Sequence, residues 1–261
     1  MTTTAASWKR YGMAVLPILS LLIFCLLWLN LAAPETSRVP SPPDVWERFL
    51  LLLEIPVSRV PLWEHILISL RRVLIGLGIA ILGGVINGML MALLPTFRAV
   101  FMPLFNMLRM VPPIAWIPLF TIWFGVGEFP KLALIVYGCI VPVTLNTYTG
   151  ISMVPAMYHS VGEIFHAGKL YRLTDIVFPS AVPAMIAGIK AALSTAWMIL
   201  LSAEMISAKQ GLGFLITRGS DSNDIALSMI SMIIIGALGC TMSILLTYLE
   251  RILCPWRTEI N

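Results

Sequence analysis

Long apolar runs separated by short polar segments dominate the chain. A helix that crosses a membrane needs about 20 mainly apolar residues. Runs of this kind occupy residues 11–33, 70–94, 100–124, 132–151, 180–206 and 225–249. The first run is longer than the roughly 7–15 apolar residues of a secretory signal, so we expect it to be a retained span. The pattern predicts an all-α polytopic membrane protein with about six transmembrane helices.

Two of these runs contain residues that change how a helix packs. The run 100–124 is interrupted by VPPIAWIP, whose prolines lack a backbone donor. Such breaks survive at membrane depth where protein or a water-filled path satisfies the freed groups. In the run 70–94, Gly84 and Gly88 form a pair of small residues four apart, which favours close approach of a second helix in lipid.

The polar segments suggest the organisation along the chain. Residues 34–69 are rich in proline and acidic residues, and PSPPDVWERFLLLLE within them predicts a short amphipathic helix outside the hydrocarbon core. Lys9 and Arg10 favour a cytoplasmic N-terminus, although the later Lys and Arg show no bias between loops. We expect residues 1–33 to form a cytoplasmic N-terminus and the first span, 34–69 an extracytoplasmic or interfacial segment, 70–250 the transmembrane core, and 251–261 a cytoplasmic tail.

Composition supports a lipid environment. The 261 residues are 59% hydrophobic and 11% charged, whereas soluble domains average about 25% charged. The net charge is +4, but Lys and Arg are scattered, so no nucleic-acid partner is expected. The four cysteines are widely spaced and are expected to be small apolar side chains rather than disulfides or metal ligands.

No pattern of a catalytic, metal or cofactor site is present. The histidines have no ligand-like spacing, and the sequence contains neither a GxSxG nor an HExxH motif. The phosphate loop GxxxxGK[ST] is also missing, so we expect no cofactor in this chain. The chain is not expected to be an enzyme, and any uphill transport needs energy from another subunit.

One charged segment, SVGEIFHAGKLYRLTDIVFP (160–179), follows the fourth run. Its apolar residues Val161, Ile164, Phe165 and Gly168 fall at the i, i+3, i+4, i+7 spacing of an amphipathic helix. The segment is therefore either an ordinary interfacial loop or a docking helix for a soluble partner.

Three blocks resemble the permease subunit of binding-protein-dependent ABC importers, in the branch for nitrate, sulfonates, taurine and bicarbonate: RMVPPIAWIPLFTIWFGVGE (109–128), VFPSAVPAMIAGIKAALSTAW (177–197) and AEMISAKQGLGFLI (203–216). SPPDVWERF after the first run is similar too, so the resemblance covers about residues 40–250. It implies the type I importer fold in a bacterial cytoplasmic membrane and transport by alternating access. It also implies separate ATP-binding subunits that bind the ATP, a second permease chain as a homodimer, and an extracytoplasmic solute-binding protein.

The resemblance identifies 153–179 with the family's cytoplasmic coupling loop. Its signature is Glu-Ala-Ala, three residues and Gly, and anchoring on Pro179 puts Ser160, Val161 and Gly162 at Glu-Ala-Ala and His166 at the glycine. The signature is thus largely absent, which leaves open how coupling works here. The implied ATPase-coupling residues are Ser160, Val161, Gly162, Glu163, Ile164, Phe165, His166, Gly168 and Pro179.

Polar residues inside the runs are the candidates for the translocation path. An arginine at a helix centre costs about 2.5–3.5 kcal/mol on insertion scales, so Arg109 should face a cavity or a partner. It either attracts an anion in the path, forms a structural ion pair or extends its charged end to the membrane interface. Glu204 either pairs with a cation or lines the outer gate. The candidate path residues are Arg109, Asn106, Asn146, Ser194 and Glu204.

The sequence leaves the cargo open. A small anion is expected, taurine-like or another sulfonate, nitrate or bicarbonate. One alternative is an importer of a neutral heterocyclic cofactor precursor, and another is an ATP-independent channel or secondary carrier.

Overall fold

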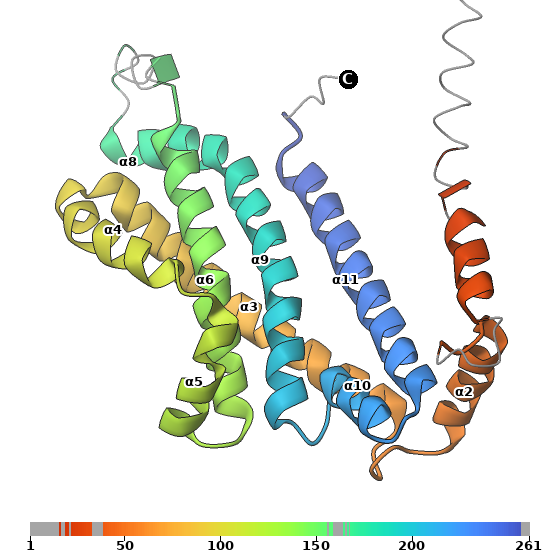
Figure 1. The fold of residues 1–261 in the computed structure, drawn as a ribbon. Coiled ribbons are helices and arrows are strands. Elements are labelled where there is room, and N and C mark those ends of the chain that lie inside the picture. The colour runs from red at the N-terminus through yellow and green to blue at the C-terminus, as the bar shows by residue number, and fades with distance from the viewer. Residues whose placement is uncertain are drawn as a thin grey trace, which may run out of the picture. The chain divides into compact units, whose positions relative to one another are not determined.

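The computed structural model describes residues 16, 19–20, 22–32, 39–155, 157–158, 164, 166 and 168–256. Within them every regular element is a helix (Figure 1). In chain order these are α2 (Pro42–Glu54), α3 (Leu62–Leu93), α4 (Pro95–Arg109), the 3₁₀ turn η1 (Pro113–Trp116), α5 (Ile117–Phe124), α6 (Glu128–Ser152), α8 (Lys169–Tyr171), the π-helical turn η2 (Arg172–Val177), α9 (Phe178–Ser207), α10 (Leu212–Asp221) and α11 (Ile225–Leu253). The all-α prediction is confirmed.

Four helices in the described residues are long and apolar enough to cross a membrane: Leu62–Leu93, Glu128–Ser152, Arg172–Ser207 and Ile225–Leu253. The pair Pro95–Arg109 and Pro113–Phe124 makes a fifth candidate that is bent by 85°. The bend lies at Pro112 and Pro113, where the sequence predicts a break. Residues Leu22–Ala32 form a shorter apolar helix. The rest of the expected first span lies outside the described residues, so a count of six stays a prediction.

The second span differs from the prediction at its start. It was expected to begin near residue 70, but α3 begins at Leu62. The expected boundary places His65 and Ser69 in the polar segment 34–69, whereas their side chains, like that of Arg72, are buried inside the protein. The last residues of the segment 34–69, from Leu62 onward, are therefore part of α3.

The chain divides into two compact units. In the first, residues 1–62 with 216–230, the expected amphipathic helix is present as α2. Its first turn is held by a capping box between Ser41 and Asp44. The two bonds from Ser41 lower the pKa of the Asp44 carboxyl below its usual value, so the cap is retained above that pKa and is lost as the pH falls through it. In the same unit Arg48 pairs with Asp224 at 2.7 Å.

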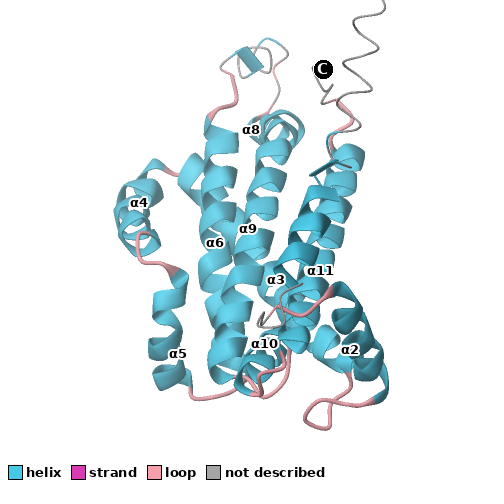
Figure 2. Cartoon of the chain, turned by 45° about the vertical axis from the view of Figure 1, so that its right-hand side comes forward, coloured by secondary structure: helices cyan, strands magenta, loops and turns pink. Residues whose placement is uncertain are grey.

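The second unit, residues 63–215 with 231–261, is built around α6 and α9. These two helices lie side by side in both views (Figures 1 and 2). They approach closely because glycines stand at the contacts: a Cβ at Gly188 would lie 2.6 Å from Asn146 Cβ, and one at Gly150 would lie 2.8 Å from Ala184 Cβ.

The predicted pair of small residues in α3, Gly84 and Gly88, lies at a close contact with another helix. A Cβ at Gly84 would lie 2.7 Å from Val143 Cβ, and one at Gly88 would lie 2.6 Å from Thr147 Cβ. Both neighbours belong to α6. Helices in lipid associate mainly through such close packing, because the apolar side chains gain little by leaving the lipid. The glycines therefore fix α3 against α6.

Candidate functional site

A buried polar cluster joins one end of α3, α6 and α9. From α3 come His65, Ser69 and Arg72, which are 0%, 0% and 5% exposed. Their spacing of four and three residues places them on one face of the helix. A buried arginine is costly unless it is paired and hydrogen-bonded, so the partners of Arg72 determine what this cluster is.

Glu204, in the last turns of α9, is the buried partner of Arg72. Its side chain is completely buried, and Arg72 Nη1 donates to its Oε1 at 2.6 Å. The Ser69 hydroxyl is 2.8 and 2.9 Å from the two carboxylate oxygens, and the Gly213 N–H donates to Oε2 at 2.9 Å. Several donors thus compensate the buried carboxylate.

The QGLG loop, residues 210–213, completes the cluster. Three successive N–H groups enter it: Gly211 donates to His65 Nδ1 at 3.0 Å, Leu212 to Ser69 Oγ at 2.9 Å, and Gly213 to Glu204. The first amides of a helix lack partners within the helix, and here side chains of α3 and α9 supply them for α10. Arg72 Nη1 also donates to the Gln210 carbonyl at 3.0 Å.

Glycine is required at position 211. Its φ is +121°, in a region that L side chains rarely adopt, and a Cβ there would lie 2.5 Å from the Glu204 carboxylate. This gives the AEMISAKQGLGFLI block a structural role: it folds the chain back so that the loop amides reach the carboxylate.

The other side of the Arg72 guanidinium carries a second carboxylate. Nε and Nη2 donate to the two oxygens of Glu128, at 2.7 and 2.5 Å. Glu128 is the first residue of α6 and its side chain is 59% exposed, against 0% for Glu204. Lys131 Nζ lies 3.4 Å from Glu128. Arg72 thus connects one fixed, buried carboxylate with one accessible carboxylate.

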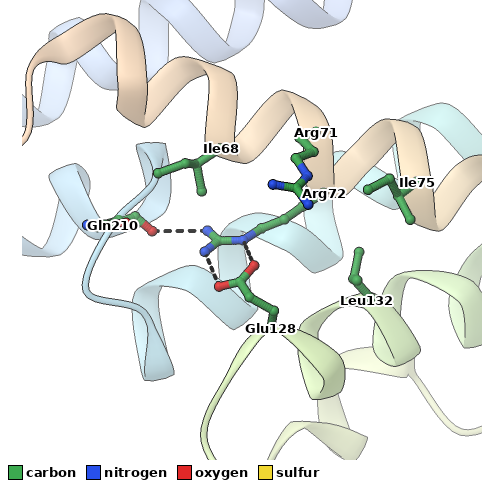
Figure 3. Close-up of a pocket in the computed structure, with 7 residues that line it drawn as sticks. All are labelled: Ile68, Arg71, Arg72, Ile75, Glu128, Leu132 and Gln210. Carbon is green, nitrogen blue, oxygen red and sulfur yellow. Dashed lines mark hydrogen bonds and ion pairs between the residues drawn. The ribbon is translucent and has the colours of Figure 1, made fainter.

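A cavity of about 290 Å³ opens beside this ion pair (Figure 3). Its polar lining is Arg71, Arg72, Glu128 and Gln210, and its apolar lining includes Ile68 and Leu132. Arg71 is exposed, and within the described residues no ion pair involves it. The cavity is lined by the accessible part of the cluster, whereas Glu204 lies behind Arg72.

The candidate path residues lie on three helices, α4, α6 and α9. Arg109 is exposed at the end of α4, and Asn106 is half-buried one turn earlier. Asn146 is half-buried on α6, where its amide donates to the Pro142 carbonyl at 2.8 Å. Ser194 is exposed on α9, ten residues before Glu204. Their role in a path stays a prediction. The expected pairing of Glu204 with a cation is present, and that cation is Arg72 rather than Arg109.

The expected coupling residues are only partly described. Ser160, Val161, Gly162, Glu163 and Phe165 lie outside the described residues. Ile164 and His166 are exposed, and Gly168 precedes the helical residues Lys169–Tyr171. Pro179 lies in the first turn of α9, directly after the π-helical turn η2. Where this segment joins the membrane helices, a cavity of about 570 Å³ is lined by residues that include Leu93, Ile151, Arg172 and Val177.

Arg72, Glu128, His65 and Ser69 are the residues that sequence reasoning missed. Arg72 stands near the start of the second apolar run and Glu128 follows the interrupted one, and their neighbours in sequence assign neither of them a role. The i, i+4, i+7 spacing of His65, Ser69 and Arg72 was a usable signal, because it puts three polar groups on one helix face. Nothing in the sequence marks Glu204 and Glu128 as their partners.

Comparison with known proteins identifies the family to which this helical architecture belongs. Residues 62–258 match the family model of the binding-protein-dependent transport system inner membrane component. The taurine transport system permease protein TauC of Escherichia coli (strain K12) is 31% identical, with 97% of this chain and 94% of that protein covered. The bicarbonate transport system permease protein CmpB of Synechococcus elongatus is 28% identical, with 91% and 88% covered. The nitrate import permease protein NrtB of Synechocystis is 28% identical, with 92% and 89% covered.

Two solved transporters share the fold. The inward-facing MetNI methionine ABC transporter has a TM-score of 0.52 at 17% identity, covering 71% of this chain and 91% of that one. An amino acid ABC transporter crystallised with histidines has a TM-score of 0.59 at 11% identity, covering 80% and 96%. With a family model that matches most of its length and a polytopic α-helical structure, the chain belongs to the binding-protein-dependent transport system inner membrane components and is a membrane-spanning permease subunit of an ABC importer.

Proposed function

We propose that this permease forms the translocation path for a small solute that carries an oxyanion, such as a sulfonate, nitrate or bicarbonate. The observation that supports this is that relatives aligning with nine-tenths or more of the chain are named for taurine, bicarbonate and nitrate. Taurine carries a sulfonate, so all three present planar or tetrahedral groups of negatively charged oxygens. A basic chain of net charge +4 suits such cargo.

The energy comes from a separate subunit. The sequence contains no phosphate loop, so ATP is bound and hydrolysed on partner chains. We assign the segment 153–179 to the contact with them, on the cytoplasmic side. A second copy of the permease completes the path, and an extracytoplasmic binding protein delivers the solute. ATP binding and hydrolysis then move the coupling segments and reorient the path between the two sides.

Reconstitution tests this proposal. The chain is placed in proteoliposomes with its ATPase subunit, and its binding protein is added on the outside. Uptake of labelled taurine, nitrate and bicarbonate is measured with and without ATP in the lumen. We expect uptake of at least one of these anions only when ATP and the binding protein are both present.

Each alternative gives a different result. Uptake that continues without ATP would identify a channel or a secondary carrier. A binding protein that purifies with a neutral heterocycle, together with ATP-dependent uptake of that compound and of no anion, would identify an importer of cofactor precursors.

A further inference from the structure

We propose that the cavity beside Arg71 and Arg72 is an oxyanion-binding site, and that the Glu128 carboxylate occupies its main donors until the solute displaces it. This inference rests on the proposed import of an anion and assigns that anion a binding site on this chain. With the segment 169–177 on the cytoplasmic side, the cavity lies at the extracytoplasmic end, because α6 and α9 run between the two (Figure 1).

The donors of Arg72 are arranged for two carboxylates of different accessibility. Nη1 is directed to the buried Glu204, while Nε and Nη2 form a fork toward Glu128. That fork matches two oxygens of a carboxylate, a sulfonate or a nitrate equally well. Since the Glu128 side chain is 59% exposed, a solute anion can reach the fork without disturbing Glu204.

Arg71 supplies a positive charge that favours replacement of the Glu128 carboxylate by the solute anion. It lines the same cavity, it is exposed, and it forms no ion pair within the described residues. The ion-pair cluster and its cavity together hold three cations, Arg71, Arg72 and Lys131, and two carboxylates, Glu128 and Glu204, so these groups in their ionised forms carry one excess positive charge. An entering anion therefore finds an uncompensated cation as well as the fork.

The turn before Glu128 has open space at its two glycines, although the rings of Phe124 and Phe129 contact each other across it with centroids 4.9 Å apart. Gly125 and Gly127 precede Glu128, and a Cβ at either position would meet no atom within 4 Å. No close packing therefore holds this turn at its glycines, in contrast to Gly211 and Gly213, which are tightly packed against Glu204. The accessible carboxylate of Glu128 thus follows a turn whose glycines are open, whereas the buried carboxylate of Glu204 packs against the tight turn at Gly211 and Gly213.

The size and lining of the cavity favour a small solute. Its volume of about 290 Å³ lies at the lower limit of the roughly 300–1,000 Å³ typical of small-molecule sites. Ile68, Ile75 and Leu132 form apolar walls next to the two arginines. A short organic sulfonate, with one anionic head and a small apolar or polar body, fits this combination of groups.

Binding to the full chain in phosphatidylcholine nanodiscs tests the site. Ethanesulfonate is the probe, and neutral ethanesulfonamide, of nearly the same shape, is the control ligand, both measured by calorimetry at low salt. Glu128→Gln removes the competing charge and is expected to tighten ethanesulfonate binding by about tenfold, the order of one charge-assisted hydrogen bond. Arg71→Gln is expected to weaken it by about tenfold for the same reason. Ethanesulfonamide should bind to none of the proteins.

Arg98→Gln is the matched control, because Arg98 is an exposed arginine on α4 and does not line the cavity. It should leave binding unchanged. The inference is wrong if Glu128→Gln binds ethanesulfonate no more tightly than the wild type, if Arg71→Gln and Arg98→Gln behave alike, or if no protein binds the probe. In those cases ATP-dependent uptake by the wild-type complex would still support the proposed function, whereas a complex that imports no anion would overturn that function itself.

Discussion

Two arginines in this chain show how much the surroundings of a residue determine its role. Arg109 stands in an apolar run and was predicted to face a cavity or a partner, yet its side chain is exposed at the end of α4. Arg72 stands near the start of an apolar run, and it is buried between Glu128 and Glu204. Apolar neighbours in sequence therefore did not identify the buried charge, because burial depends on helices that are distant in the chain.

The Arg72–Glu204 pair should be essential for stability. We predict that Arg72→Met lowers the free energy of unfolding by about 3–5 kcal/mol, because it leaves the Glu204 carboxylate buried without its main cation. Adding Glu204→Leu to this variant should restore part of the loss. Melting of the purified chain in detergent measures both effects, and Arg71→Met, at the exposed neighbour, should change the melting temperature little. A single variant as stable as the wild type would contradict the structural role of the pair.

For Arg109 we predict an effect on transport and not on assembly. Glu204 already has Arg72 as its cation, so Arg109→Gln breaks no ion pair among the residues that the structure describes. If Arg109 lines the anion path, the variant should assemble with its ATPase and keep basal ATP hydrolysis, but import anion far more slowly. Arg109→Lys should lie between the two, because it keeps the charge and loses the planar fork. Full import by Arg109→Gln would exclude the path role.

At the scale of helices, the sequence predicted elements well wherever local chemistry determines them. The proline break after Arg109, the capped helix α2 and the glycine contact of α3 were all foreseeable, because proline, capping and small residues act over a few positions. The early start of α3 and the role of the QGLG loop were not foreseeable. They depend on hydrogen bonds between residues more than 130 positions apart.

The glycine contact between α3 and α6 can be tested with two alanine substitutions on one helix. A Cβ at Gly84 would lie 2.7 Å from Val143 Cβ, whereas one at Gly78 would meet nothing within 4 Å. Gly84→Ala should destabilise the chain by about 1–3 kcal/mol through overpacking. Gly78→Ala should instead stabilise it by about 0.5–1 kcal/mol, because alanine is the better helix former. Equal melting temperatures for the two variants in detergent would argue against a close contact here.

A further prediction concerns the coupling segment. Phe165→Asp places a charge on the apolar stripe proposed to enter the ATPase, and an unpaired buried charge costs several kcal/mol. We expect normal insertion in the membrane, with loss of ATPase co-purification and of transport. Ser220→Asp, at an exposed position of α10 outside the segment 153–179, is the control and should retain both. A Phe165→Asp chain that still co-purifies and transports would show that the contact lies elsewhere.

For the whole molecule, composition was sufficient to predict a polytopic helical fold, but charge bias did not orient it. Labelling can do so, in a background without the native cysteines. A cysteine at Lys169 should react with an impermeant thiol reagent only from the cytoplasmic side, and a cysteine at Arg59 only from outside. Labelling of both from the same side would contradict the six-span topology and the assignment of the coupling segment.

The distance in sequence between Arg72 and Glu204 has a consequence for biogenesis. The two residues are 132 positions apart, so at about 5–20 residues per second the ribosome needs roughly 7–26 s to make the second after the first. During that interval α3 enters the bilayer with His65, Ser69 and Arg72 lacking their final partners, and Glu128 is the first carboxylate to arrive. We therefore expect the nascent helix to stay at the insertion machinery or near the headgroups until α9 is made. A chain truncated before Glu204 would expose a polar helix face within the bilayer, a feature by which membrane quality control could recognise it.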